Sequence, residues 1–481
     1  MTEYRIIYIY ICMYIYIYIA KFSYRHEQYT HPDIVLSQNA SLMGINKRFA
    51  IFAICEKNIN VYSHTLGPFF YINQFNHCTH LVRVPLEFFS RLGEQVGDPL
   101  PKTKFILLSN TGRCGSTLLT QLFEEMPNTV AISEPEVLME FSHEKTFDHF
   151  PKTQRDLLLR ACIRLLFKSA SQSKGHKKFN EIECLVIKPK AHGIFIAQDL
   201  NYLYPKMKHL YMYRHPAEYV RSVRSVYNSL LHPIVRHLMI FSAFNMDMNG
   251  FIMRQFGQKC DNQESAYVRK MTNALDQLDT MGNLEQRFSA LFCGNILSFM
   301  KILTEVNNNI QVVSYHELTD NTHSNMKLIR KHCEIESESE VEESDDNFVI
   351  CLPENDSQNN SGLSRNRLRS FQTVLKDKEI SVVDEVLQLC GFPPCEKFPL
   401  DAAGFTKLLG ISRTDVITSQ HNGQRSELLP RYDPEAHLKA RTSSGTSPKS
   451  VSKFAGESEF KTIQTPLVTN KSLWLPVNRF F

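Results

Sequence analysis

The chain has 481 residues, 43% hydrophobic and 22% charged, a composition typical of a globular protein with a buried core. Its 54 basic and 50 acidic residues leave a formal net charge of +4, which fits an anionic ligand but does not favour nucleic acid. The 12 cysteines form no CxxC pair and no zinc-finger spacing with histidine, so no metal site is expected.

Residues 1–99 form an N-terminal region without a recognisable catalytic motif. Within it, residues 6–20 alternate Ile and Tyr between two basic residues, and three interpretations stay open. The stretch is a short signal-anchor, a β-strand prone to aggregation, or the product of a wrongly assigned gene start. We favour the anchor. Residues 81–96 have the apolar spacing of a short amphipathic helix.

From residue 100 to residue 400, predicted strands alternate with predicted helices. The strands are short apolar runs at residues 105–108, 183–187, 209–213 and 310–315. Strands that alternate with helices build a parallel sheet with helices on both faces, so we expect an α/β domain. Residues 230–304 predict a helical insert, and a further helix is expected over 377–389.

The remaining chain, residues 401–481, is rich in Ser, Thr and Lys and predicts a disordered tail. Just before it, Cys390 and Cys395 flank a turn in the sequence CGFPPC. A small disulfide loop and a pair of buried thiols are equally compatible with that spacing.

A glycine-bearing loop follows the first predicted strand of the domain. It runs into a predicted helix, so backbone N–H groups and the helix dipole together favour an anion there. Its glycines permit tight turning, its arginine supplies a permanent cation, and its hydroxyls can donate hydrogen bonds. The candidate ligand-binding residues of this loop are Gly112, Arg113, Cys114, Gly115, Ser116 and Thr117.

This loop does not match the signature of nucleotide triphosphatases, GxxxxGK[ST], because Gly115 rather than a lysine precedes Ser116. No GxGxxG segment supports a dinucleotide-binding fold either. A P-loop kinase or nucleotide hydrolase is therefore disfavoured, and the loop needs a different anionic ligand.

With its neighbours, the loop resembles the sulfotransferase superfamily, and most closely the Golgi carbohydrate and tyrosyl-protein branches. These branches carry R-x-G-[ST]-[ST], which here reads RCGST from Arg113, followed by LF, P-x-x-V and EP at residues 122–135. A second family motif joins a strand-end arginine to a serine eight positions later, as in Arg214 and Ser222. The resemblance covers residues 101–398 and implies a P-loop-type, three-layer fold.

The resemblance also implies an activity, which is transfer of a sulfuryl group from 3′-phosphoadenosine-5′-phosphosulfate to a hydroxyl or amine acceptor, with a carbohydrate as one candidate. It assigns the 5′-phosphosulfate to Arg113 and its loop, and the 3′-phosphate to Arg214 and Ser222. Glu134 is the candidate base. A surface glutamate before a proline is the alternative reading.

Lys188 is a further candidate catalytic residue, which would contact the transferred group. Its alternative is a solvent-facing lysine at a strand end. Small-molecule members of the superfamily use K-T-H at this place, whereas this chain reads KPK from Lys188. The missing histidine favours Glu134 as the base.

Several features of the expected protein stay open. The acceptor and the oligomeric state are not specified by the sequence, and a catalytically inactive sulfotransferase-fold binding protein is the main alternative function. The resemblance and the segment at residues 6–20 together favour a type II Golgi membrane protein over a cytoplasmic one. The donor nucleotide and a hydroxyl acceptor are the expected partners.

Overall fold

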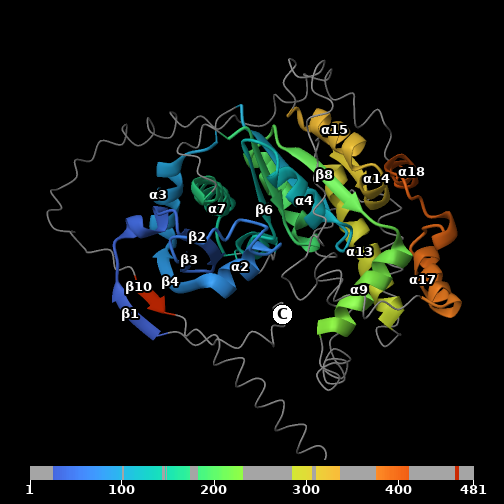
Figure 1. Ribbon diagram of the computed structural model, residues 1–481, viewed down its shortest axis with the longest axis horizontal. Coiled ribbons are helices and arrows are strands. Elements are labelled where there is room, and N and C mark those ends of the chain that lie inside the picture. The colour runs from blue at the N-terminus through green and yellow to red at the C-terminus, as the bar shows by residue number, and fades with distance from the viewer. Residues whose placement is uncertain are drawn as a thin grey trace, which may run out of the picture.

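A computed structural model describes residues 25–99, 102–142, 147, 149–173, 182–230, 284–305, 310–335, 375–410 and 461–464. It contains a five-stranded parallel sheet covered by helices and a second, antiparallel sheet formed mainly by the N-terminal region. Figure 1 shows the antiparallel sheet on the left, the parallel sheet in the centre and most of the later helices on the right.

The parallel sheet confirms the expected α/β architecture. Its strands are near-continuous apolar runs, as expected where both faces of a sheet are covered. The spatial order is β6-β7-β5-β8-β9, with every neighbouring pair parallel. The strands are β5 (Lys104–Asn110), β6 (Thr129–Ser133), β7 (Cys184–Lys188), β8 (Lys208–Tyr213) and β9 (Ile310–Ser314).

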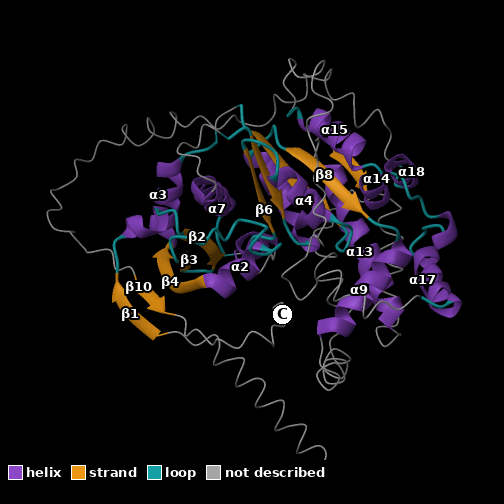
Figure 2. Cartoon of the chain, in the orientation of Figure 1, coloured by secondary structure: helices purple, strands orange, loops and turns teal. Residues whose placement is uncertain are grey.

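Helices cover both faces of this sheet because successive strand residues point to opposite sides. Ile106 and Leu108 of β5 pack in one hydrophobic cluster with α4 (Ser116–Glu124) and α15 (Thr322–Cys333). Phe105 and Leu107 pack in a second cluster, to which α7 (Lys152–Ser173), α8 (Ala197–Leu203) and α13 (Leu284–Glu305) contribute. The result is the expected three-layer arrangement (Figure 2).

Further helices lie beside the sheet or pack on its helices, as α17 does on α13 and α9. They are α5 (Met139–Ser142), α9 (Pro216–Leu230), α14 (Tyr315–Asp320), α17 (Asp377–Leu389) and α18 (Ala402–Leu408). The helix expected over 377–389 is confirmed. Helix α18 lies beyond residue 400, where composition predicted disorder. Its Phe405 is fully buried and stacks on Tyr213 with a centroid distance of 3.9 Å, so apolar packing extends regular structure past that point.

The N-terminal region supplies the antiparallel sheet, whose order is β1-β10-β4-β3-β2. Its strands are β1 (Arg25–Tyr29), β2 (Ala40–Ile45), β3 (Phe49–Cys55), β4 (Cys78–Pro85) and β10 (Lys461–Gln464), accompanied by α2 (Phe70–His77) and α3 (Leu86–Val96). The expectation of one helix over 81–96 is wrong in its first part, because residues up to Pro85 pair with β3. Helix α3 packs on α7, where Gly93 lies directly against Ala161.

Two sequence expectations concern cysteines and the membrane. Cys390 and Cys395 are free, buried thiols, which rules out the small disulfide loop. A disulfide that the sequence did not suggest joins Cys55 to Cys78, at the ends of β3 and β4. In the described part of the chain no helix has the length and apolar character to span a membrane, and residues 6–20 lie outside that part. Of the helical insert expected over 230–304, the structure describes residue 230, at the end of α9, and 284–304, within α13.

Candidate functional site

The loop between β5 and α4 has a backbone in which several residues adopt positive φ. Gly112 and Gly115 have φ of 82°, and Arg113 has φ of 51°. Such left-handed residues turn successive N–H groups toward one side, which is the geometry of an anion-binding nest. Gly115 is the N-cap of α4, so the nest opens onto a helix N-terminus.

Neighbouring elements hold this loop in place. Thr111 N donates to Met212 O of β8 at 3.0 Å, and Asn295 Nδ2 of α13 donates to Thr111 O at 2.7 Å. Gly112 N donates to Asn110 Oδ1 at 2.9 Å. The loop is therefore tied to both its own strand and two distant segments, and its conformation is set before any ligand binds.

Gly115 is required for a second reason besides its φ. A Cβ placed on this residue would lie 2.6 Å from Cδ2 of Tyr315. The Tyr315 ring, at the start of α14, thus covers the loop from the β9 side. Over the same ring lies Arg214, with its guanidinium carbon 4.1 Å from the ring centroid, in cation–π contact.

Of the other loop residues, one has its side chain in the hydrophobic core and two lie at the start of α4. The Cys114 side chain is fully buried among the residues under α4, and burial raises the pKa of its thiol. Cys114 therefore offers the site its backbone rather than its sulfur. Ser116 and Thr117 lie in the first turn of α4 and are largely buried, and Thr120 Oγ1 donates to Ser116 O at 2.8 Å.

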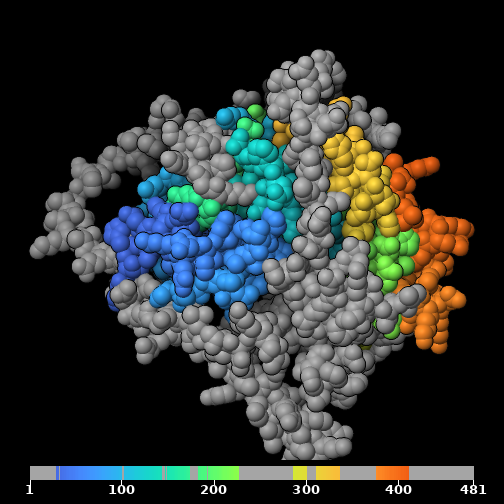
Figure 3. All heavy atoms as spheres, viewed as in Figure 1, coloured from blue at the N-terminus to red at the C-terminus, as the bar shows by residue number. Residues whose placement is uncertain are grey.

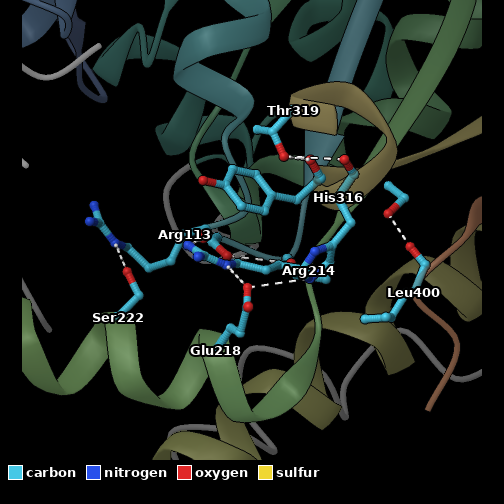
Figure 4. Close-up of polar contacts among 11 residues, drawn as sticks. Arg113, Arg214, Glu218, Ser222, His316, Thr319 and Leu400 are labelled. Atoms are coloured by element: carbon cyan, nitrogen blue, oxygen red, sulfur yellow. Dashed lines mark hydrogen bonds and ion pairs between the residues drawn. The ribbon is translucent and has the colours of Figure 1, made fainter. Parts of the chain in front are cut away.

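The structure brings the two family-like motifs together (Figure 4). Arg113 Nε donates to Ser222 Oγ of α9 at 3.1 Å, and Arg214 Nη1 donates to Arg113 O at 3.2 Å. Burial, with a smaller contribution from the neighbouring Arg214 charge, lowers the pKa of Arg113 to about 10. Its guanidinium therefore remains a cation at neutral pH, beside a second cation, in a partly buried position.

Glu218 and His316 complete this cluster, and the sequence reasoning missed both. Glu218 Oε2 accepts from Arg214 Nε at 2.8 Å and lies 3.3 Å from His316 Nε2. Burial alone would raise the pKa of Glu218, but the hydrogen bond and charge of Arg214 lower it below its usual range. The i,i+4 spacing of Arg214 and Glu218 was a readable signal for this pair.

Glu134 and Lys188 form an ion pair at the ends of the neighbouring strands β6 and β7. The Lys188 side chain is 3% exposed and that of Glu134 15%, so neither alternative reading, a solvent-facing lysine or a surface glutamate, describes its position. Glu134 N donates to Lys188 O at 2.6 Å, and Glu134 has φ of 57°. A non-glycine residue held at positive φ is strained, and such strain concentrates at functional sites.

A second pair lies next to the first. Lys190 Nζ donates to Glu136 Oε2 at 2.6 Å, and its ammonium lies 4.4 Å from the ring centroid of Tyr71 in α2. Lys188 in turn lies 5.5 Å from the ring centroid of Phe69. Both aromatic residues come from the N-terminal region, to which the sequence assigned no role.

These groups share one edge of the parallel sheet. The carboxyl ends of β5, β6, β7 and β8 all deliver residues to it, which is where ligands of α/β sheets bind. The Glu134 carboxylate is close enough to Arg113 to raise its pKa in opposition to burial. Every candidate site residue therefore lies either in the loop, beside it, or in the adjacent ion pair.

Comparisons with known proteins give little beyond this geometry. No family model matches the chain, and no curated protein matches it. Among solved structures, the sulfotransferase domain from the curacin biosynthetic pathway matches with a TM-score of 0.31 and 11% sequence identity, over 63% of this chain and 100% of that domain.

Proposed function

We propose that this chain transfers a sulfuryl group from 3′-phosphoadenosine-5′-phosphosulfate to a hydroxyl or amine acceptor, with a carbohydrate as the candidate acceptor class. The observation that carries the proposal is the convergence of Arg113, Arg214 and Ser222. Two motifs more than a hundred positions apart meet at one loop through hydrogen bonds of 3.1 and 3.2 Å.

The residues present fit such a donor. The loop nest and the N-terminus of α4 suit a phosphosulfate anion. At position 115, the positive φ and the nearby Tyr315 ring leave room only for glycine. Arg214 and Ser222 suit a second phosphate, since an arginine fork and a hydroxyl can share its oxygens. The loop lacks the lysine that a Walker-type triphosphate site requires. This supports 3′-phosphoadenosine-5′-phosphosulfate over ATP as the ligand.

The proposed transfer uses the ion pair and the loop together. The acceptor oxygen forms a bond to sulfur while the bond between sulfur and the bridging phosphate oxygen breaks. Glu134 takes the acceptor proton, and 3′,5′-bisphosphoadenosine leaves with the electron pair. Arg113 and the loop N–H groups stabilise the charge that grows on the leaving phosphate, and Lys188, which is paired with Glu134, contacts the transferred group.

Two measurements on the purified protein test this function. Thermal unfolding with 3′,5′-bisphosphoadenosine should show stabilisation that ATP does not give, because ligand that binds the folded state raises the unfolding temperature. Transfer from labelled donor should then be screened across glycans, peptides and small phenols. No stabilisation by the bisphosphate contradicts the donor. Stabilisation without transfer to any acceptor favours the inactive binding protein.

We also propose that the protein works in the Golgi lumen, attached through residues 6–20 as a type II anchor. The Cys55–Cys78 disulfide supports an oxidising compartment. Alkylation of the cell-derived protein before and after reduction, with mass spectrometry of the peptides that contain these two cysteines, tests it. Alkylation of both thiols without reduction contradicts the proposed compartment.

A further inference from the structure

One segment of the N-terminal region, residues 61–71, lines a pocket together with α4 and the edge strand β6, and we call this segment the strap. Asn73, which is 2% exposed, holds it: Asn73 Nδ2 donates to Val61 O at 3.1 Å and to Gly67 O at 2.9 Å. Tyr62 and Phe70, near its two ends, stack with ring centroids 4.6 Å apart. Specific hydrogen bonds and aromatic packing therefore fix the conformation of the strap.

The strap contacts the far end of α4 and both lysines beside the loop. His64 Nδ1 lies 3.1 Å from Glu124 Oε2 at the end of α4. Phe69 faces the ammonium of Lys188, and Tyr71 faces that of Lys190. On the face seen in Figure 3, the blue residues of the N-terminal region border the cyan residues that follow them in the chain. The proposed catalytic ion pair is thus bounded on one side by residues from outside the sheet domain.

A small pocket lies between the strap, helix α4 and strand β6. It is lined by Pro68 and Phe70 of the strap, by Thr117 of α4 and by Ser133 of β6. Ser133 is 9% exposed, and its Oγ has no hydrogen-bond partner among the residues that the structure describes. Since Ser133 directly precedes Glu134, this is an unsatisfied hydroxyl beside the proposed base.

Charges differ between the two halves of the site. On the loop side, Arg113 and Arg214 outnumber Glu218. Beneath the strap each lysine has its own carboxylate, Lys188 with Glu134 and Lys190 with Glu136, so that half is neutral. An anionic group entering there would find both lysine charges already balanced by carboxylates, so it would gain no net attraction. An uncharged group would meet the partly exposed Tyr71 ring and hydrogen-bonding side chains.

We propose that the strap is the acceptor wall of the site, and that Tyr71 selects a hydroxyl acceptor that is uncharged where it contacts this ring. The proposal rests on the proposed sulfuryl transfer, and it makes Tyr71 a specificity-determining residue. Burial, and then the charges of Glu134 and Glu136, raise the pKa of Tyr71 well above its usual range. Its phenol therefore stays protonated and can donate a hydrogen bond to a neutral acceptor.

The test uses two oligosaccharides of equal length, one of N-acetylglucosamine and galactose and one with glucuronate in place of galactose. The wild type should sulfate the neutral one with the higher kcat/KM. Tyr71→Ala should raise the acceptor KM roughly fivefold or more, while its affinity for 3′,5′-bisphosphoadenosine stays unchanged. Tyr202→Ala removes an exposed tyrosine that makes the same kind of contact with Lys152, at 4.5 Å, and should change neither value.

Glu136→Gln provides a gain-of-function arm. It leaves the Lys190 charge unbalanced, so the ratio of kcat/KM for the glucuronate acceptor over the neutral one should rise several-fold. A wild-type preference for the glucuronate acceptor, an unchanged KM in Tyr71→Ala, or failure of the nucleotide-loaded wild type to bind either oligosaccharide overturns the acceptor wall. Failure of the wild type to bind the bisphosphate is a different result, which contradicts the donor assignment itself.

Discussion

Arg113 Nε donates a 3.1 Å hydrogen bond to Ser222 Oγ, across 109 positions of sequence. The bond joins the loop after β5 to the second turn of α9, and it places a cation and a hydroxyl at the same point. Because Arg214 also donates to the Arg113 carbonyl, the loop, the end of β8 and the start of α9 form one connected unit. A nucleotide bound there would be held by all three segments.

Ser222→Ala should weaken binding of 3′,5′-bisphosphoadenosine about five- to tenfold, since one hydrogen bond to a charged group is lost. Isothermal titration calorimetry measures the change. Ser225→Ala is the matched control. It lies three residues further along α9, where its hydroxyl donates to Arg221 O within the helix, and its removal should leave nucleotide affinity unchanged. Equal losses of nucleotide affinity in both variants would argue against a direct role for Ser222.

Gly115→Ala should destabilise the fold and abolish nucleotide binding. The alanine is strained at φ of 82° by about 1–2 kcal/mol, and its Cβ would also lie 2.6 Å from the Tyr315 ring. Gly410→Ala separates the two effects, because Gly410 has φ of 69° with no atom within 4 Å of the added Cβ. Denaturant unfolding should show a larger loss of unfolding free energy for Gly115→Ala than for the control. An equal or smaller loss would mean that the Tyr315 ring moves aside freely.

Glu134→Gln should lower kcat by roughly a hundredfold or more, because the amide cannot accept the acceptor proton. Bisphosphate affinity should change little, since the donor is held by the loop and by α9. Steady-state kinetics beside thermal stabilisation separates the two steps. Glu183→Gln, an exposed carboxylate at the opposite end of the sheet, should leave both values unaltered. Full activity in Glu134→Gln would remove it as the base.

Glu334 makes an electrostatic contribution that depends on pH. Its hydrogen bonds to Lys208 and Lys104 lower the pKa of Glu334 from 4.5 to about 2. A carboxyl group whose pKa is lower in the folded state than in the unfolded state gives its full stabilisation above the unfolded pKa. That stabilisation is lost as the pH falls through the folded pKa. The difference in unfolding free energy between wild type and Glu334→Gln, up to about 1 kcal/mol for so exposed a pair, should therefore shrink from about pH 5 towards pH 2. A difference independent of pH in this range would show that the carboxylate charge does not stabilise the fold.

The local parts of this protein could be predicted from its sequence. The apolar runs of β5, β7, β8 and β9 specify a buried parallel sheet, because few other structures bury such short continuous runs beside helices. The spacing of Gly112, Arg113 and Gly115 specifies the loop, since left-handed backbone and close approach leave little other choice at the glycines.

Only the tertiary structure decided which side chains from distant segments meet at the site. Tyr315 and His316 join Arg214 and Glu218 because β9 and α14 lie beside β8 and α9, and no periodic pattern encodes those contacts. The strap places Phe69 and Tyr71 beside Lys188 and Lys190 for the same reason. Sequence patterns report which face of an element is buried, whereas the choice of neighbour depends on packing over the whole chain.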